Sequence, residues 1–296
     1  MSSRPRIAVT LGDPAGVGPE ITETALASTD LPKDFEFEIL GRFAASPGQP
    51  TPDGARAALD ALEAAAQGTL SGRYAAVVTG PIHKARMREV GFHFPGQTEF
   101  FAHRWHCRNH AMLLTGGRLS VALVTAHLPL AQVPHQISAP EIVRVGSLLA
   151  DFLRRRGIAH PRIAVAGLNP HAGEEGLLGS EERDLITPAI GQLSQRRADC
   201  EITGPCSPDT VFHQAVHGRF DGVLCMYHDQ GLIPLKLHAF DTGVNVTLGL
   251  PFPRTSPDHG TAFDIAGKNI ANPASMLAAL QLAAALAKNA PPTATP

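Results

Sequence analysis

Short apolar runs, many of them β-branched, alternate along the chain with longer stretches in which alanine and leucine recur at helical spacing. This alternation predicts an α/β fold on a mostly parallel sheet, because buried parallel strands are short and apolar while the covering helices are amphipathic. The predicted strands are Arg6–Leu11, Phe35–Leu40, Ala75–Thr79, Ala111–Thr115, Val121–Thr125, Arg162–Ala166, Gly222–Met226 and Val244–Leu248. The predicted helices are Pro19–Ala27, Asp53–Gln67, Thr98–Trp105, Ala139–Arg156, Glu181–Arg196, Pro208–His217 and Pro273–Ala287.

Two segments interrupt this pattern. Ala44–Asp53 is rich in proline and glycine, and we interpret it as a surface connection inside one domain, since helical spacing resumes directly after it. The tail Ala290–Pro296 is expected to be disordered.

Composition excludes several classes of protein. The formal net charge is −2 and 18% of residues are charged, without a basic block, so nucleic acid is not an expected partner. Four cysteines without a CxxC pair favour a reducing compartment over a disulfide scaffold. No signal-like start is present, and no apolar run approaches the roughly 20 residues of a membrane helix. We therefore expect a cytoplasmic enzyme that does not contact membranes.

Three histidines follow predicted strands in similar, turn-like settings. They are His127 in VALVTAHLPL, His171 in IAVAGLNPHAGEEG and His228 in GVLCMYHDQGLIPLK. Open α/β sheets bind ligands at the carboxyl ends of their strands, so these imidazoles are candidates for one site. Taken singly, each is more typical of a hydrogen-bonded structural histidine than of a metal ligand. Together they suit a catalytic divalent metal with an open coordination position.

Other motifs allow both a structural and a functional interpretation. The glycines of TLGDPAGVGPEI permit either a tight strand-to-helix turn or close approach to a ligand, and Asp13 there could orient a neighbour. In FPGQTEFF, Gln97 and Thr98 open a helix whose free amides could bind an anion, although Thr98 could simply cap it. The glutamates of HAGEEGLLGSEE are interpreted as a solvated acidic loop and helix start rather than a second metal site.

Eight motifs in order resemble one enzyme family. They are GDPAGVGPE, TGPIHK, PGQTEF, HLPL, NPHAGEEG, SPDT, MYHDQGLIPLK and DHGTAFDIAG. Together they resemble the 4-hydroxythreonine-4-phosphate dehydrogenase family of pyridoxine biosynthesis. The segment HGTAFDIAGKNIANP also resembles the adenosine-binding loop of isopropylmalate and isocitrate dehydrogenases, which are β-decarboxylating dehydrogenases of related fold.

The resemblance implies a ligand set for a metal and a substrate. The metal ligands would be His127, His171 and His228, with the third histidine supplied by a neighbouring subunit, which implies a homodimer with interfacial active sites. The metal would be zinc, magnesium or cobalt. The residues that match substrate contacts are Gln97, Thr98, Lys236, Asn245 and Arg254.

One of these positions departs from the family pattern. The family usually has histidine where this chain has Gln97, in the pair that contacts phosphate. Glutamine could still donate a hydrogen bond to a phosphate oxygen but carries no charge, so the identity of the substrate is open. Arg254 suits a phosphate or carboxylate through its bidentate fork, yet from local sequence alone it could equally be a surface charge.

Three polar residues are candidates for catalysis. Lys236 could act as a general acid or base, or pair with a substrate anion. Asp229 adjoins His228 and Asp209 lies in SPDT, and both could orient metal ligands, although Asp209 could also be an ordinary residue at a helix start.

By analogy with the decarboxylating dehydrogenases, three residues would bind the nucleotide. They are His259, Asp264 and Asn272, with Asp264 on the ribose hydroxyls. A carboxylate on the ribose favours NAD over NADP, and both stay open as cofactors.

The resemblance implies two α/β/α lobes with a central cleft, as in isocitrate and isopropylmalate dehydrogenases. We expect residues 1–90 with 255–296 in a first lobe that holds the nucleotide loop, and 91–254 in a second lobe that holds the metal ligands and dimer contacts. The expected reaction is metal- and NAD(P)-dependent oxidation of 4-phosphohydroxythreonine at its 3-hydroxyl, followed by β-decarboxylation to 3-amino-2-oxopropyl phosphate.

Alternative functions stay open from the sequence. A sibling dehydrogenase would act on threonate or erythronate phosphate, or on an aromatic cis-dihydrodiol carboxylate. A metal-dependent hydrolase could use the same three imidazoles to activate water. A non-catalytic ligand-binding module would tolerate the loss of all three histidines.

Overall fold

The computed structural model describes residues 4–289, so the tail Ala290–Pro296 lies outside the described residues. The chain divides into two compact units, each built around five neighbouring strands. Unit 1 comprises the residues up to Asn109 and those from Val244 onward, and unit 2 comprises His110–Gly243. This is a mixed α/β fold, as the alternating pattern predicts. No helix among residues 4–289 is long and apolar enough to cross a membrane.

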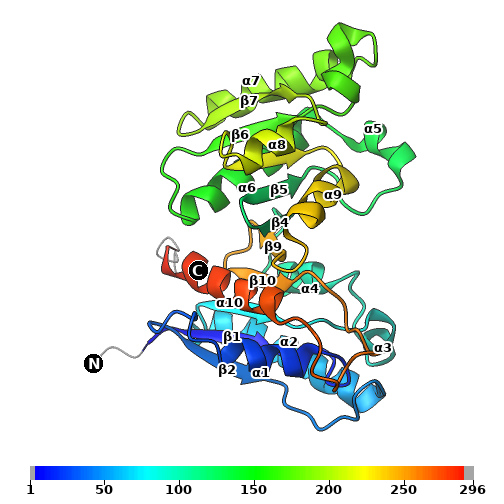
Figure 1. Ribbon diagram of the computed structural model, residues 1–296, viewed down its shortest axis with the longest axis vertical. Coiled ribbons are helices and arrows are strands. Elements are labelled where there is room, and N and C mark those ends of the chain that lie inside the picture. Colours follow the sequence, from blue (N-terminus) through cyan, green and yellow to red (C-terminus); the bar gives the residue numbers. More distant parts are fainter. Residues whose placement is uncertain (1–3, 290–296) are drawn as a thin grey trace. The chain divides into compact units, whose positions relative to one another are not determined.

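The sheet of unit 1 has the strand order β2-β1-β3-β10-β9. Neighbouring strands are parallel except β10 and β9, which pair antiparallel. The strands are β1 (Arg6–Thr10), β2 (Glu36–Leu40), β3 (Ala76–Thr79), β9 (Val244–Leu248) and β10 (Arg254–Pro257). Segments from both ends of the chain thus lie side by side, and Figure 1 shows the red helix α10 beside the blue N-terminal elements.

Helices cover both faces of this sheet. Helix α10 packs on β3, β9 and β10 and also contacts α1, while α2 and α4 cover the opposite face in a core of aromatic and alanine side chains. The helices are α1 (Gly18–Leu26), α2 (Pro52–Leu70), α3 (Lys84–Glu89), α4 (Gln97–Arg104) and α10 (Ala274–Lys288).

The sheet of unit 2 has the strand order β4-β5-β8-β6-β7, parallel except for the β4–β5 hairpin. The strands are β4 (Ala111–Gly116), β5 (Leu119–Leu123), β6 (Arg162–Ala166), β7 (Glu201–Cys206) and β8 (Gly222–Cys225). Helices α8 and α9 pack on one face, and α6 and α7 pack on the other. The helical segments are η1 (Leu130–Gln132), α5 (Val133–Gln136), α6 (Ala139–Arg155), η2 (Pro170–Gly176), η3 (Glu182–Ile186), α7 (Thr187–Arg196), α8 (Val211–Val216) and α9 (His228–Ala239).

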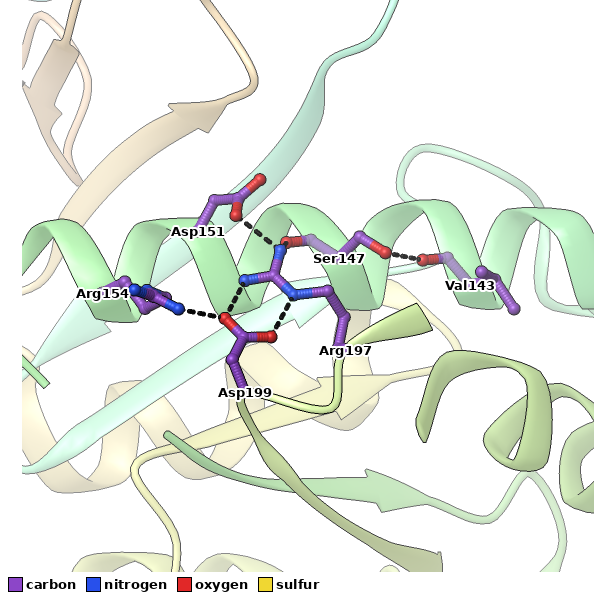
Figure 2. Close-up of polar contacts among 6 residues, drawn as sticks. All are labelled: Val143, Ser147, Asp151, Arg154, Arg197 and Asp199. Carbon is purple, nitrogen blue, oxygen red and sulfur yellow. Dashed lines mark hydrogen bonds and ion pairs between the residues drawn. The ribbon is translucent and has the colours of Figure 1, made fainter. Parts of the chain in front are cut away.

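A network of charged groups ties the end of α7 to α6. The Arg197 guanidinium donates to Asp199 at 2.9 and 3.0 Å, to Asp151 and to the carbonyl of Ser147, and Arg154 also pairs with Asp199 (Figure 2). The hydrogen bonds from Arg197 hold the pKa of the Asp199 carboxyl well below its usual range. This network fixes the turn that leads into β7.

The unit boundaries differ from those expected from the sequence. Residues 91–109 and 244–254 belong to unit 1, although we placed them in the second lobe. The reason is packing: Phe100, Phe101 and Trp105 bury their rings in the core under α2, and β9 pairs with β10. The aromatic content of 92–105 therefore decides which core this segment joins.

Several elements were not predicted because glycine or proline interrupts their pattern. Strand β7 contains Gly204 and Pro205, and helix α9 contains Gly231 and Pro234. Gly231 lies close to the sheet, since a Cβ there would be 3.1 Å from Cys225 Sγ and 3.1 Å from Leu123 Cδ2. Because α9 begins at His228, this residue is the first of a helix and not part of a turn, which corrects our interpretation of its setting. The predicted helix at Glu181–Arg196 is a π-turn, η3, that runs into α7.

Candidate functional site

The pairing of strands explains why the three candidate histidines lie at one edge of the unit 2 sheet. Strands β5, β8 and β6 are parallel neighbours, with Leu123 opposite Cys225 and Leu224 opposite Val165. Parallel strands present their carboxyl ends at the same edge. His127 follows β5, His228 follows β8 and His171 follows β6, so all three emerge at that edge.

His127 and His228 are close to one another. Their ring centroids lie 5.5 Å apart, and both side chains reach solvent. His228 Nδ1 lies 2.7 Å from Asp229 Oδ1, so the carboxylate binds one ring nitrogen and leaves Nε2 for another partner. Two imidazoles, one of them oriented by a carboxylate, are a donor set that fits a divalent metal.

His171 does not complete a metal site in the single chain. Within residues 4–289, no group of three or more His, Cys, Asp or Glu side chains is arranged to hold a metal ion. His171 instead lies near Asp209, whose pKa is lowered by a hydrogen bond from Ser207 and further by the charge of His171.

The backbone of His171 has an unusual conformation. Residues 171–175 all have positive φ, with His171 at φ 51° and ψ 30°. A left-handed turn costs about 1–2 kcal/mol for each residue that carries a Cβ. Only Gly173 among the five avoids this cost, so the surroundings must stabilise the turn.

Glu182 provides that stabilisation. Its side chain is only 4% exposed, and its carboxylate accepts hydrogen bonds from the backbone N–H groups of Leu168 and Asn169, both at 2.7 Å, and from Asn169 Nδ2 at 3.0 Å. Gly173 packs directly against it, since a Cβ there would lie 2.6 Å from Glu182 Oε2. We expected Glu182 to be solvated, and the structure corrects this: it is a buried anchor for the backbone that leads to His171.

Gln230 connects the loops that carry His228 and His171. This 7%-exposed side chain accepts from the N–H of Met226 and donates to the carbonyl of Gly167, both at 2.7 Å. Its amide therefore links the end of β8 to the end of β6. Sequence reasoning missed both Gln230 and Glu182, although a glutamine directly before the apolar run GLIPL was a usable signal.

Four of the predicted substrate-binding residues lie in unit 1, where they form a polar face. Gln97 and Thr98 begin α4, Asn245 lies on β9 and Arg254 begins β10. Thr98 Oγ1 lies 3.1 Å from Thr247 Oγ1, and Arg254 donates to Thr79 Oγ1 at 2.6 Å. The fifth residue, Lys236, lies on α9 in unit 2, with Nζ 5.7 Å from the ring centroid of Phe240.

Arg254 is a buried cation in this face, not a surface charge. It is 4% exposed, and among residues 4–289 it forms no ion pair. Burial lowers its pKa to about 10, while the charge of Glu99 opposes this shift. A buried guanidinium without a bonded counterion is a favourable partner for an anionic ligand.

Three atoms of this face are buried without a hydrogen-bond partner. They are Gln97 Oε1, Asn245 Oδ1 and Arg254 Nε. Leaving a buried polar atom unpaired costs about 1–3 kcal/mol, so native structures rarely retain one without a reason. Three such atoms on predicted substrate contacts support a ligand site here. Thr79 and Thr247 extend it; Thr247 was detectable from sequence, because it shares a strand face with Asn245 two residues away.

The residues expected to bind the nucleotide lie in or beside the loop after β10. His259, Asp264 and Asn272 are exposed, and Asn272 Oδ1 accepts from the N–H of Ala274 at the start of α10. The loop packs on the glycine-rich segment, where Val17 donates to the carbonyl of Thr261 at 2.9 Å. The structure leaves all three side chains accessible to a ligand.

The glycines of TLGDPAGVGPEI allow neighbouring backbone segments to pack closely against this motif. A Cβ at Gly12 would lie 2.1 Å from the carbonyl oxygen of Pro81, and one at Gly16 would lie 2.7 Å from that of Thr261. Asp13 is buried and accepts from the N–H of Ala15, and burial raises its pKa. This favours the structural interpretation of the motif.

Comparison with known proteins places this arrangement in a family. The chain is 43% identical over 331 residues to a 4-hydroxythreonine-4-phosphate dehydrogenase of Caulobacter vibrioides, covering 97% of this chain and 98% of that protein. It is 40% identical over 343 residues to a putative D-threonate 4-phosphate dehydrogenase of Bradyrhizobium diazoefficiens, covering 98% and 99%.

Solved structures agree. The crystal structure of 4-hydroxythreonine-4-phosphate dehydrogenase from Klebsiella pneumoniae matches with a TM-score of 0.82 at 39% identity, covering 96% of this chain and all of that one. A β-decarboxylating dehydrogenase from Thermococcus kodakarensis matches with a TM-score of 0.53 at 17% identity, over 96% of this chain and 83% of that one, which shows a shared fold. The model of the family "Pyridoxal phosphate biosynthetic protein PdxA" matches residues 17–283. The chain belongs to this family.

Proposed function

We propose that this chain is a 4-hydroxythreonine-4-phosphate dehydrogenase, an oxidoreductase of the cytoplasm that uses NAD or NADP. The substrate would be 4-phosphohydroxythreonine, and the product after decarboxylation 3-amino-2-oxopropyl phosphate. The observation that carries the proposal is the coincidence of two features: similarity along nearly the whole chain to dehydrogenases of that name, and buried, unpaired polar atoms on three of the residues matched to substrate contacts.

The reaction balances as an oxidation followed by loss of carbon dioxide. The C3–H hydride leaves to the nicotinamide and the 3-hydroxyl loses its proton, which forms a ketone β to the carboxylate. The C1–C2 bond then breaks, carbon dioxide departs, and C2 takes up a proton. A divalent metal, when bound, would stabilise negative charge on the substrate oxygen in both stages.

The residues of this chain divide the remaining tasks. Arg254 would bind an anionic group of the substrate through its buried guanidinium, and Thr98 and Asn245 would orient the substrate by hydrogen bonds. Lys236 would pair with an anion or exchange the proton of the substrate. Asp264 would bind the ribose, with His259 and Asn272 beside it.

We infer that the metal, zinc, magnesium or cobalt, binds His127 and His228 together with a His171 from a second copy of the chain. Asp229 would orient the ring of His228, since it already bonds Nδ1. Asp209 would orient His171. This homodimer proposal is supported by the incomplete ligand set of the single chain. It predicts that purified protein is dimeric in light scattering and that His228→Ala loses bound metal.

A second candidate substrate is D-threonate 4-phosphate, which has a hydroxyl where 4-phosphohydroxythreonine has an amino group. Gln97 and the similarity to a putative dehydrogenase of that compound favour it. Family membership favours either dehydrogenase over a metal-dependent hydrolase, which the imidazoles alone would also suit.

The test is reduction of NAD and of NADP by purified protein with each of the two phosphorylated acids, after chelation and with zinc, magnesium or cobalt restored. We expect metal-dependent formation of reduced nicotinamide together with carbon dioxide, with the highest kcat/KM for 4-phosphohydroxythreonine. A higher kcat/KM for D-threonate 4-phosphate would transfer the proposal to that substrate. Absence of turnover and of nucleotide binding would overturn it.

A further inference from the structure

We propose that Gln97 accepts a hydrogen bond from a hydroxyl or ammonium group of the substrate and does not bind its phosphate. This is the reverse of the donor role expected for this position from sequence. The inference rests on the proposed function, because it concerns the substrate of the same site.

The first argument is the direction of the Gln97 amide. Gln97 Nε2 donates to the carbonyl oxygen of Gly80 at 3.1 Å. Turning the amide around would bring Oε1 against that carbonyl, so that two acceptors would face each other. The contact with Gly80 therefore fixes the orientation of the amide and uses one of its two N–H groups.

The second argument is the atom that remains. Gln97 Oε1 is buried and has no hydrogen-bond partner. It is an acceptor only, so a favourable ligand must bring an N–H or O–H group to it. The dianion of a phosphate monoester, such as the phosphate group of the substrate, has only acceptor oxygens, so Gln97 Oε1 would repel it.

Arg254 complements this acceptor with a donor nearby. It bonds Thr79, the residue before Gly80, and its Nε is buried and unpaired. Thr79 and Gly80 thus position two buried, unpaired atoms by hydrogen bonds. Arg254 Nε is a positively charged donor, and Gln97 Oε1 is a neutral acceptor. A small acid with an anionic group and a hydroxyl or ammonium group matches both, whereas an anion alone matches only Arg254.

The first experiment needs no turnover. Methyl phosphate, whose dianion has no O–H group, is titrated at about pH 8 into wild-type protein and Gln97→Met, and its affinity is measured by calorimetry. We expect Gln97→Met to bind methyl phosphate within about twofold of the wild type, because the Gln97 side chain does not contact the phosphate. Gln67→Met, on an exposed position of α2, should match the wild type. A loss of about tenfold in phosphate affinity in Gln97→Met would overturn the inference.

The second experiment identifies the donor. Values of kcat/KM are measured for wild type and Gln97→Met with 4-phosphohydroxythreonine, with D-threonate 4-phosphate, and with the analogue that has two hydrogens at C2. We expect Gln97→Met to lose about tenfold on the two substrates with a donor at C2 and less than about twofold on the analogue. A larger loss on the ammonium substrate than on the hydroxyl one identifies the ammonium as the preferred donor.

Equal losses on all three substrates would contradict a contact between Gln97 and the C2 donor. If the wild type turns over none of them, the proposed function fails, and phosphate titration still decides the role of Gln97.

Discussion

The two buried polar regions of this molecule differ in how completely their hydrogen bonds are made. In unit 2, Glu182 and Gln230 are buried and their side-chain oxygens and nitrogens bond the backbone around the ends of β6 and β8. In unit 1, Gln97, Asn245 and Arg254 each bury an atom that has no partner. The first region is a scaffold that positions residues, and the second has bonding capacity left for a ligand. Buried polar residues of one fold can thus be separated into two kinds. Those whose polar atoms all have hydrogen-bond partners stabilise the structure, and those with an unpaired atom are candidates for binding a ligand.

The comparison predicts that mutations in the unit 2 region lower stability, whereas mutations in the unit 1 region lower substrate binding. The largest expected effect is on stability, at Glu182. Glu182→Gln replaces an acceptor oxygen by an NH₂ group that faces backbone donors. We expect the free energy of unfolding to fall by about 3 kcal/mol. Glu175→Gln, on an exposed side chain of the neighbouring turn, should change it by less than about 0.5 kcal/mol. The measurement is urea unfolding; equal stability of the two variants would show that Glu182 is not an anchor.

In the site, the same kind of change should affect binding and spare stability. Arg254→Met removes a buried charge that has no ion-pair partner among the described residues, so the melting temperature should stay level or rise. Loss of the guanidinium should lower kcat/KM about a hundredfold, which corresponds to about 2.7 kcal/mol. Arg42→Met, which breaks an exposed ion pair, serves as the control for both measurements. A marked loss of stability in Arg254→Met would place Arg254 with the scaffold.

The Arg197 network of Figure 2 should give an intermediate effect on stability that depends on pH. Arg197→Met is expected to lower the free energy of unfolding by about 1–2 kcal/mol at neutral pH, because its side chain is 12% exposed while its partners are more open.

The sign of the pH dependence follows from Asp199, whose pKa is depressed in the folded chain. Its contribution is complete above the unfolded pKa of about 3.9 and is lost as pH falls through the lower folded pKa. Melting temperatures of wild type and Arg197→Met should therefore converge below about pH 4. Arg42→Met, which breaks an exposed ion pair with Glu23, should follow the wild type. A constant gap between wild type and Arg197→Met down to low pH would exclude Asp199 as the source.

The smallest predicted effect is that of Asn245→Ala. It removes an unpaired acceptor, so stability should change by less than about 0.5 kcal/mol, while kcat/KM falls about tenfold through the lost substrate contact. Thermal unfolding and steady-state kinetics test both parts. Unchanged kinetics would remove Asn245 from the site.

Sequence predicted the α/β class and most strands well, because apolar runs such as Gly222–Met226 belong to strands buried on both faces. It did not predict β7 or α9, since Gly204, Pro205, Gly231 and Pro234 break the local pattern while tertiary packing favours the element. Local propensity contains no information about such contacts.

The candidate site was predictable only as far as residue types. Family motifs pointed to Gln97 and Arg254, but burial of Arg254 and the bond from Gln97 to Gly80 depend on residues far along the chain. The role of Glu182 was misread for the same reason: in HAGEEGLLGSEE four glutamates look alike, and only the fold buries this one so deeply.

The two units differ in when their sheets can be completed during synthesis on the ribosome. Unit 2 is a continuous segment, His110–Gly243, whose five strands are all synthesised before β9. Unit 1 has β10 between β3 and β9, so the strand that completes its sheet leaves the ribosome after unit 2 is finished. Until then the edge of β3 has unpaired backbone groups that can recruit other chains. Arg254 begins that late strand, so its guanidinium reaches its buried position only when nearly the whole chain has been translated.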